Sequence, residues 1–491
     1  MPTLEHLEAV ARGAAPPPLE SADRDRIAAG RAVVEDALRA GRVVYGVSTG
    51  FGQLASVQID AADAAQLQVN LLRSHAVGSG EPLDAEVVRG MLLLLASSLR
   101  RGHSGVRVEL VELLLGLLER GVVPVIPSRG SVGSSGDLAP LAHLGLVLIG
   151  EGEALVDGER MPGAAALARA SLSPVALQAK EGLALINGTH LMAAAGGLAL
   201  RDARRVLDAA VVAVALSLEA FMGSTVPFDE RLHAVRGQPG PARVAERLRA
   251  LLAGSPVVAS HADCGRVQDP YTLRCAPQVL GAIADALDYV SGALERELNA
   301  VTDNPLVFAD GGDVLSGGNF HGQPLSLPLD HLALAMTELA SFAERRVYAL
   351  LTPGYAGLPA FLTAHPGLSS GLMIAQYAAA ALVNECQVLS HPAGAGSIPT
   401  SSGMEDFNSM GAFAALKART VVGHAAHVVA TELVCACQGL EFHRPLRSTD
   451  ALEDALARVR TTVPRLEEDR SLAGELDALA VAVRMGDLAL A

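Results

Sequence analysis

The sequence predicts a mainly α-helical protein built around a bundle of long helices. Half of its 491 residues are hydrophobic, yet only 3% are aromatic and there is no Trp, so Ala, Leu and Val fill the apolar positions. Such residues favour closely packed helices over an aromatic-rich β-sandwich. Apolar residues also recur at helical spacing over five long stretches. These stretches cover residues 205–222, 276–301, 324–351, 370–390 and 410–437.

The first 200 residues differ from the rest of the chain. Short helical patches alternate there with glycine-rich loops, which carry motifs around Tyr45 and Ser135. We therefore expect a smaller N-terminal region, residues 1–200, that holds the functional loops. Residues 201–491 are expected to form the long-helix bundle, with peripheral helices in the charged tail that starts at Arg447.

The composition argues against nucleic acid and membranes as partners. The formal net charge is −15, so anionic surfaces would be repelled. A long uncharged run, residues 347–384, is broken by prolines and glycines, which favours buried helices over a membrane span. Residues 1–14 contain acids and no apolar core, so no signal peptide is expected.

The cysteines indicate a reduced environment and no metal site. There are five, an odd number, without the spacing of metal ligands. We therefore expect a cytoplasmic protein that needs no metal. The five positions are Cys264, Cys275, Cys386, Cys435 and Cys437.

The most informative segment is residues 130–143, which reads GSVGSSGDLAPLAH. A phosphate-binding loop would need GxGxxG, or a Lys after the glycines, and neither is present, so no nucleotide is expected. A nucleophile elbow, GxSxG, fails because Asp137 stands two residues after Ser135. A plain glycine–serine turn that caps a helix at Asp137 is the structural alternative.

This segment resembles the signature of the MIO-dependent aromatic amino acid ammonia-lyases, a family that includes histidine-specific members. In that family a small residue, a serine and a glycine cyclise with loss of two waters to give the electrophile MIO, 4-methylidene-imidazol-5-one. The resemblance implies that Ser134, Ser135 and Gly136 form this group. A side chain at position 136 would hinder the attack of its amide nitrogen on the Ser134 carbonyl carbon. The family usually has Ala at position 134, so Ser134 is a mild departure.

Two further loops resemble motifs of the same family. YGVSTGFG, residues 45–52, resembles YGxxTGFG, whose Tyr is the catalytic base or acid, which implies that role for Tyr45. EGLALINGT, residues 181–189, matches a motif whose Asn helps to hold the substrate and the MIO oxygen, which implies that role for Asn187. The family frequently has Gln where His190 stands, and we assign His190 no role.

Residues 268–275, QDPYTLRC, resemble a motif that binds the substrate. The resemblance implies a Tyr271 near the reacting nitrogen and an Arg274 that clamps the substrate carboxylate, and it carries Gln268 over as a binding residue. An Arg three residues after a Tyr shares its face when the segment is helical, and Arg can hold a carboxylate with two hydrogen bonds. Phe320 resembles the residue that packs beside MIO.

Two places bear on the substrate. The pair Ser74-His75 resembles the histidine-specific members, and both side chains can exchange hydrogen bonds with an imidazole. Glu405 also matches the histidine type and could accept a proton from the imidazole or the ammonium group. Three neighbours of Glu405 depart from the family pattern and put the imidazole pocket in question: Gly403, Met404 and Phe407.

The resemblance thus implies non-oxidative deamination of L-histidine to trans-urocanate and ammonia. It also implies a long-helix bundle of the ammonia-lyase/fumarase-like type, assembled as a homotetramer with D2 symmetry whose active sites are shared between subunits. Three alternatives stay open at this point. They are an MIO-dependent ammonia-lyase or 2,3-aminomutase acting on Phe or Tyr, a fumarase-like lyase, and a cofactor-free helical scaffold.

Overall fold

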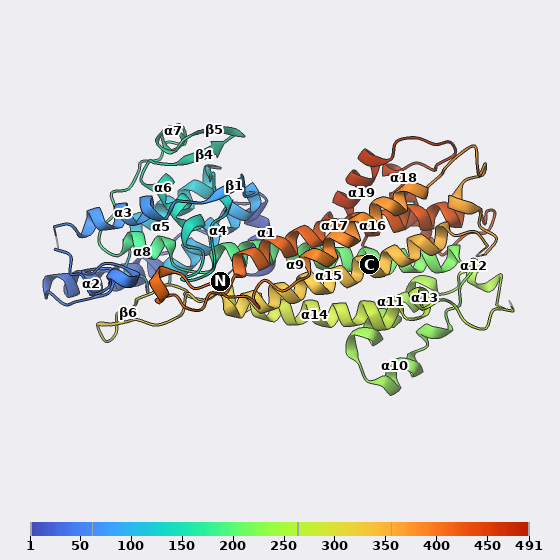
Figure 1. The fold of residues 1–491 in the computed structure, drawn as a ribbon, viewed down its shortest axis with the longest axis horizontal. Helices are drawn as coiled ribbons and strands as arrows, with labels where there is room; N and C mark the ends of the chain where they lie inside the picture. The colour runs from blue at the N-terminus through green and yellow to red at the C-terminus, as the bar shows by residue number, and fades with distance from the viewer. Residues whose placement is uncertain (1, 61, 263–264, 355, 490–491) are drawn as a thin grey trace. The chain divides into compact units, whose positions relative to one another are not determined.

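The computed structural model describes residues 2–489 apart from 61, 263–264 and 355, and helices dominate this part of the chain (Figure 1). The prediction of a mainly α-helical fold with long helices is confirmed. The chain forms two compact units. The first comprises Met1–Leu198, Ser291–Asp330 and Pro392–Leu416, and the second comprises Ala199–Val290, His331–His391 and Lys417–Ala491. The expected division into an N-terminal region, residues 1–200, and a long-helix bundle, residues 201–491, stays a prediction.

The first unit is built from short helices and three small sheets. Its core includes leucines of α4 and α5 that are fully buried, among them Leu92 and Leu114, and α4 packs against both α1 and α5. Burial of such leucine faces stabilises short helices that would not persist alone in water. The helices are α1 (Leu4–Ala11), α2 (Ser21–Arg39), α3 (Ala64–His75), α4 (Ala85–Leu99), α5 (Val108–Glu119), α6 (Leu138–Leu148), α7 (Gly163–Arg169), α8 (Glu181–Ile186) and the 3-10 turns η1 (Gly52–Leu54) and η4 (Ser401–Gly403).

All strand pairs in the first unit are antiparallel. β1 (Ser79–Pro82) pairs with β3 (Pro127–Arg129), and Ser79 lies opposite Arg129. The three-stranded sheet has the order β2-β4-β5, and β6 pairs with β7. The bounds are β2 (Val123–Pro124), β4 (Glu153–Val156), β5 (Glu159–Pro162), β6 (Leu306–Phe308) and β7 (Asp313–Leu315).

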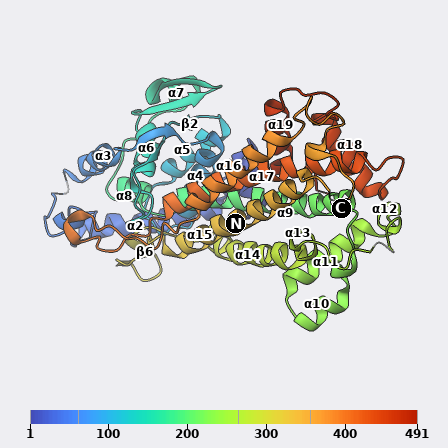
Figure 2. The ribbon, with the colours of Figure 1, turned by 45° about the vertical axis from the view of Figure 1, so that its right-hand side comes forward.

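Four long helices pass from one unit into the other: α9 (His190–Ala220), α14 (Ala276–Glu297), α15 (Gln323–Leu351) and α17 (Gly411–Glu441). Their second-unit portions run alongside one another in both views (Figures 1 and 2). The remaining elements of the second unit are η2 (Val226–Phe228), α10 (Glu230–Arg236), α11 (Pro239–Leu252), α12 (Pro256–Ala259), α13 (Tyr271–Arg274), η3 (Ala360–Leu362), α16 (Met373–Leu389), α18 (Asp450–Thr462) and α19 (Ala473–Met485).

A buried ion pair joins three of the long helices within the second unit. Arg346 on α15 donates to both carboxylate oxygens of Glu432 on α17, at 2.6 and 2.7 Å, and neither side chain is exposed. Ser217 on α9 also donates to Glu432, at 2.9 Å. Every buried charge in this group therefore has hydrogen-bonded partners, as burial of a charge requires.

The five predicted long stretches are all helical, but the predicted start of the first was wrong. α9 begins at His190, about four turns before residue 205. Gly196 and Gly197 lower the helical propensity of this segment. Added Cβ atoms would crowd Leu329 at Gly196 and Leu7 at Gly197, so close packing accounts for both glycines.

The uncharged run of residues 347–384 is divided between the end of α15, a loop and α16. Within the described residues, only α17 is long and apolar enough to cross a membrane by length and composition. Because 78% of its apolar window is buried in the protein, α17 has the surroundings of a core helix.

The described cysteines are free thiols, and three of them are buried. Burial raises the pKa of Cys386 and of Cys437 to about 12, so both stay protonated near neutral pH. Cys264 lies outside the described residues.

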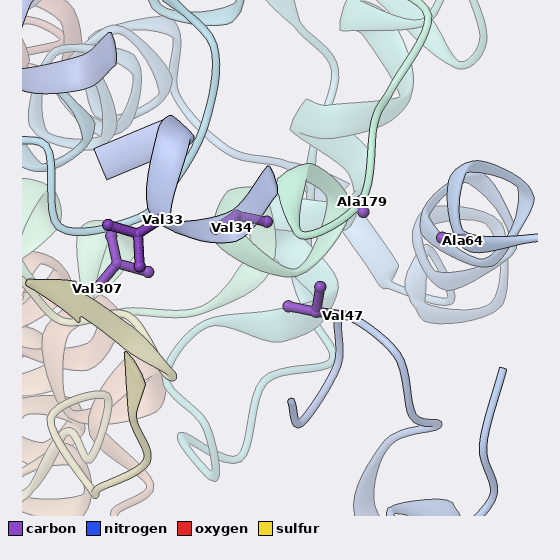
Figure 3. Packing of buried hydrophobic residues seen from close by; sticks show 6 residues of the cluster. All are labelled: Val33, Val34, Val47, Ala64, Ala179 and Val307. Atoms are coloured by element: carbon purple, nitrogen blue, oxygen red, sulfur yellow. The ribbon is translucent and has the colours of Figure 1, made fainter. Parts of the chain in front are cut away.

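A small hydrophobic cluster supports the loop that contains Tyr45. Val47 of this loop packs with residues of α2, α3 and β6 and with Ala179 (Figure 3). Val44, on the other side of Tyr45, packs against the same cluster. The apolar neighbours of Tyr45 thus anchor the loop. The buried members are Val33, Val34, Val47, Ala64, Ala179 and Val307.

Candidate active site

The loop of residues 130–137 joins β3 to α6 and has a backbone that demands glycine. Gly136 has φ +82°, and an added Cβ would overlap the carbonyl group of Gly188. Either fact alone disfavours any other residue. Ser134 is buried, whereas Ser135 is half-buried and lines a pocket. The loop therefore presents one serine to the pocket and holds its two neighbours inside the protein.

Backbone pairing fixes this loop against the segment around Gly188. Gly136 and Gly188 form an isolated parallel bridge, in which Asp137 N donates to Gly188 O at 2.8 Å and Gly188 N donates to Ser135 O at 3.2 Å. In addition, Met410 N donates to Val132 O at 2.9 Å. Two segments far from the loop in sequence thus hold the backbone around Ser134-Ser135-Gly136.

Asp137 links the loop to the start of α9. Its Oδ2 accepts hydrogen bonds from the amides of Leu191 (2.9 Å) and Met192 (3.1 Å), which are otherwise unsatisfied at a helix start. Burial raises the pKa of Asp137 to about 7, and this effect outweighs the two backbone hydrogen bonds that lower it.

Asn187 is held at the pocket by a buried polar network. Its Nδ2 donates to Asn304 O (2.8 Å) and to Asp303 Oδ1 (3.2 Å). The other oxygen of Asp303 accepts from Lys180 Nζ at 2.6 Å, and both side chains are buried. Because the amide nitrogen of Asn187 is committed to this network, its carbonyl oxygen is the group free to bind a ligand.

Tyr45 reaches the same pocket from its own loop. Its hydroxyl accepts a hydrogen bond from Gly52 N at 3.2 Å. Gln68 on α3 ties the loop to α8, because it donates to Gly46 O (3.2 Å) and accepts from Leu183 N (2.9 Å). The phenol is therefore held by both the loop and the helices beneath it.

Ser74 and His75 lie at the end of α3, with Ser74 Oγ 3.0 Å from His75 Nδ1. Burial lowers the pKa of His75, and the charge of Glu405 opposes this effect only in part. His75 is consequently neutral near pH 7, so its ring has one donor and one acceptor nitrogen.

Glu405 is oriented by a hydrogen-bond relay within its own loop. Thr400 Oγ1 donates to Glu405 Oε2 at 2.7 Å and accepts from Asn408 Nδ2 at 3.1 Å. Asn408 is buried and also donates to Ile398 O at 2.6 Å. The carboxyl group of Glu405 thus sits at the end of a chain of polar groups that starts in the protein interior.

These side chains line one pocket of about 490 Å³ in the first unit. The volume lies in the range of about 300–1,000 Å³ usual for small-molecule sites. Polar groups come from six predicted residues: Tyr45, Ser74, His75, Ser135, Asn187 and Glu405. Apolar side chains form much of the remaining wall: Phe51, Leu54, Val57, Ile59, Leu67, Leu71, Leu138, Leu183 and Ile186.

Residues 3–461 match the aromatic amino acid lyase family. The chain belongs to that family. It is 53% identical to the histidine ammonia-lyase of Anaeromyxobacter dehalogenans over 99% of this chain and 98% of the relative, and 53% identical to that of Deinococcus radiodurans over 99% and 93%.

Solved structures of a histidine ammonia-lyase and of an aminomutase share the fold. A histidine ammonia-lyase from Trypanosoma cruzi is 42% identical with a TM-score of 0.92, over 99% of this chain and 92% of that one. A phenylalanine aminomutase from Pantoea agglomerans is 33% identical with a TM-score of 0.93, over 98% and 97%. These similarities confirm the predicted family and the predicted fold class.

Four predicted binding residues of this aromatic amino acid lyase do not line the pocket. Gln268, Tyr271 and Arg274 belong to the second unit, whereas all described lining residues belong to the first. Arg274 lies 4.4 Å above the ring of Tyr271, so the two share a face of α13 as expected, and Tyr271 is 69% exposed. Phe320, in the first unit, is half-buried outside the described pocket lining.

Sequence reasoning missed the groups that support the residues of this pocket. Lys180 and Asp303 hold Asn187, and Thr400 orients Glu405. One signal was available, since Lys180 is one of only two lysines beside 36 arginines. The spacing of Lys180 and Asp303, 123 residues apart, carries no signal of their contact.

Proposed function

We propose that this chain is a histidine ammonia-lyase, a carbon–nitrogen lyase that converts L-histidine to trans-urocanate and ammonia. The observation that carries the proposal is the pocket in which Ser135 and Tyr45 meet the polar set of Ser74, His75 and Glu405. The relatives named histidine ammonia-lyase, about half identical over nearly the full chain, support it.

The residues of the Ser134-Ser135-Gly136 loop fit the formation of MIO. Only glycine suits the backbone at position 136, and Ser135 is the member of the trio that lines the pocket. Once formed, MIO supplies an electrophile that makes the substrate amine a better leaving group. We propose no metal and no nucleotide for this reaction.

The other residues bind and orient the substrate in this proposal. Tyr45 moves the β-proton, and Asn187 offers its carbonyl oxygen near the reacting centre. The neutral imidazole of His75 and the hydroxyl of Ser74 exchange hydrogen bonds with the substrate ring. Glu405 accepts a proton from the imidazole or the ammonium group. The apolar wall limits water around these groups.

We further propose a cytoplasmic homotetramer that binds neither nucleic acid nor membranes. In this assembly Gln268, Tyr271 and Arg274 serve an active site shared between subunits, where Arg274 clamps the substrate carboxylate and Tyr271 lies near the reacting nitrogen. The exposure of Tyr271 leaves its ring available for such a contact. Phe320 is proposed to pack beside MIO.

The test is a substrate panel of L-histidine, L-phenylalanine and L-tyrosine, with the ultraviolet-absorbing product of each followed. We expect urocanate from histidine and no product from the other two. Product from phenylalanine or tyrosine would move the function to the related lyases or 2,3-aminomutases, which the apolar wall and the departures at Gly403, Met404 and Phe407 would then explain. Absence of product from all three would favour a cofactor-free scaffold.

A further inference from the structure

A second cavity of the first unit, of about 550 Å³, has an unusual concentration of arginines. It lies by the N-terminal segment, the start of α2, the end of α4 and the end of α14. It shares no described lining residue with the pocket of Ser135. Its charged and titratable lining includes Arg26, Arg100, Arg101, His6 and His103, together with the acids Glu20 and Asp23. We call it the arginine cavity.

The two acids of the arginine cavity are already engaged. Asp23 pairs with both Arg26 and Arg100, and Arg100 Nη2 also donates to Pro18 O at 3.1 Å. Glu20 and Asp23 form a capping box at the start of α2. Burial acts to raise the pKa of Asp23, but the hydrogen bonds from Arg100 and the Glu20 amide and the charges of Arg100 and Arg26 together lower it, so this carboxylate stays ionised. The single charge of Asp23 is shared between two guanidinium groups, so the described lining sets two carboxyl groups against three guanidinium groups.

Arg101 is the charge that remains. Its Nη1 donates to Asn299 O at 3.0 Å, and among the described residues it has no acidic partner. A guanidinium group is always charged near neutral pH and carries five donors, so most of its hydrogen-bonding capacity is unused here. The single bond to Asn299 fixes one end of the guanidinium group at the cavity wall.

Two histidines add further polar groups to the lining of this cavity. His103 Nδ1 lies 3.0 Å from Val307 O, which leaves its Nε2 as the second hydrogen-bonding atom of the ring. Burial lowers the pKa of His6, so His6 is neutral near pH 7. Among its described lining residues, the cavity therefore offers one guanidinium group without an acidic partner and two imidazole rings with hydrogen-bonding nitrogens.

We propose that the arginine cavity binds a small metabolite through a phosphate or carboxylate group held by Arg101. The planar guanidinium fork matches either group with two parallel hydrogen bonds. The volume suits a small molecule rather than a bare ion. In a chain with a net charge of −15, a cavity with one unpaired cation attracts an anion where most of the surface repels it.

The test compares Arg101→Gln with wild type. Glutamine can still donate to Asn299 O but carries no charge. Arg120→Gln is the matched control, because Arg120 is exposed and its side chain makes no hydrogen bond or ion pair with the described residues. Titration calorimetry with inorganic phosphate and with citrate, at ionic strength held constant with chloride, distinguishes the two anion sources. We expect one of them to bind wild type and Arg120→Gln, and to bind Arg101→Gln about tenfold or more weakly.

Two outcomes would overturn the proposal. One is that neither phosphate nor citrate binds wild type, and the other is that Arg101→Gln binds like wild type. Turnover without added anion should be unchanged in Arg101→Gln, so a loss of turnover would place Arg101 in another role. If Arg101→Gln fails to fold, Arg101→Lys replaces it, since lysine keeps the charge but lacks the fork and should still weaken binding. Because the readout is anion binding, the result does not depend on the proposed lyase activity.

Discussion

Ser135 is the residue of the 130–137 loop that lines the pocket. Ser134 and Asp137 are buried, and the backbone at Gly136 is pressed against Gly188. A change at Ser135 should therefore affect chemistry with little effect on folding.

We expect Ser135→Ala to abolish urocanate formation while the thermal unfolding midpoint stays close to that of wild type, because no buried contact is removed. The intact mass of the protein reports directly whether MIO has formed. Wild type should be lighter than its encoded mass by two waters, and Ser135→Ala should not. Ser134→Ala is the matched control, since position 134 needs only a small residue, and it should keep both the mass deficit and the activity. Full activity in Ser135→Ala would end the MIO assignment.

Thr400 is the residue whose role can be separated most cleanly from that of its neighbour Glu405. Thr400→Val keeps the side-chain shape but removes the 2.7 Å hydrogen bond to Glu405. Loss of a hydrogen bond to a carboxyl group costs roughly 1.5–3 kcal/mol, so we expect kcat/KM for histidine to fall about tenfold or more. Thr400→Ser restores the hydroxyl and should recover most of the activity. Loss of activity in Thr400→Ser with full activity in Thr400→Val would show that the methyl group matters and not the relay.

At the scale of elements, the sequence predicts helices well where they are long and apolar, and it misses what fixes their ends. The start of α9 at His190 depends on the carboxylate of Asp137, more than 50 residues earlier. Local periodicity cannot reveal such a cap. The residues of the candidate site also fall into those that sequence motifs predict and those that only the folded chain brings together. Motif residues such as His75 and Glu405 were predicted, whereas Lys180 and Asp303, which meet only in the folded chain, were not.

The cap on α9 makes stability depend on pH. The folded-state pKa of Asp137 is raised to about 7 from an ordinary value of 3.8, so the folded state holds this proton more tightly than the unfolded state. The raised pKa of Asp137 contributes to the free energy of unfolding in full below about pH 4. This contribution is lost as the pH rises towards 7, and the loss is roughly 4 kcal/mol at most. Asp137→Asn keeps an oxygen that can accept from Leu191 N and Met192 N but cannot ionise.

We therefore expect wild type to lose stability relative to Asp137→Asn as the pH rises from 4 to 8. The thermal unfolding midpoint of Asp137→Asn minus that of wild type should increase over this range. Thermal unfolding followed by circular dichroism at several pH values measures the difference. A gap between the two proteins that stays constant over this range would contradict the raised pKa. The titration of other groups is common to both proteins and cancels in the comparison.

At the scale of the whole molecule, the predicted binding residues fall into two sets. Tyr45, Ser135 and Glu405 line a pocket of the first unit, and Arg274 belongs to α13 of the second. A homotetramer with shared active sites accounts for both sets if residues 268–274 of one copy serve the pocket of another. Symmetric oligomers repeat such a contact at every equivalent site.

Co-expression of an inactive variant with an impaired one tests this arrangement. Ser135→Ala should be inactive, and Arg274→Ala should mainly raise KM and lower kcat/KM, because it removes a bidentate contact with the substrate carboxylate. If sites are shared, co-expressed subunits of the two variants give some sites that contain both wild-type residues, roughly a quarter for random mixing. The mixture should then show wild-type KM and about a quarter of wild-type kcat. If each chain builds its own site, every site carries one of the two defects, and activity at low histidine cannot exceed that of Arg274→Ala alone.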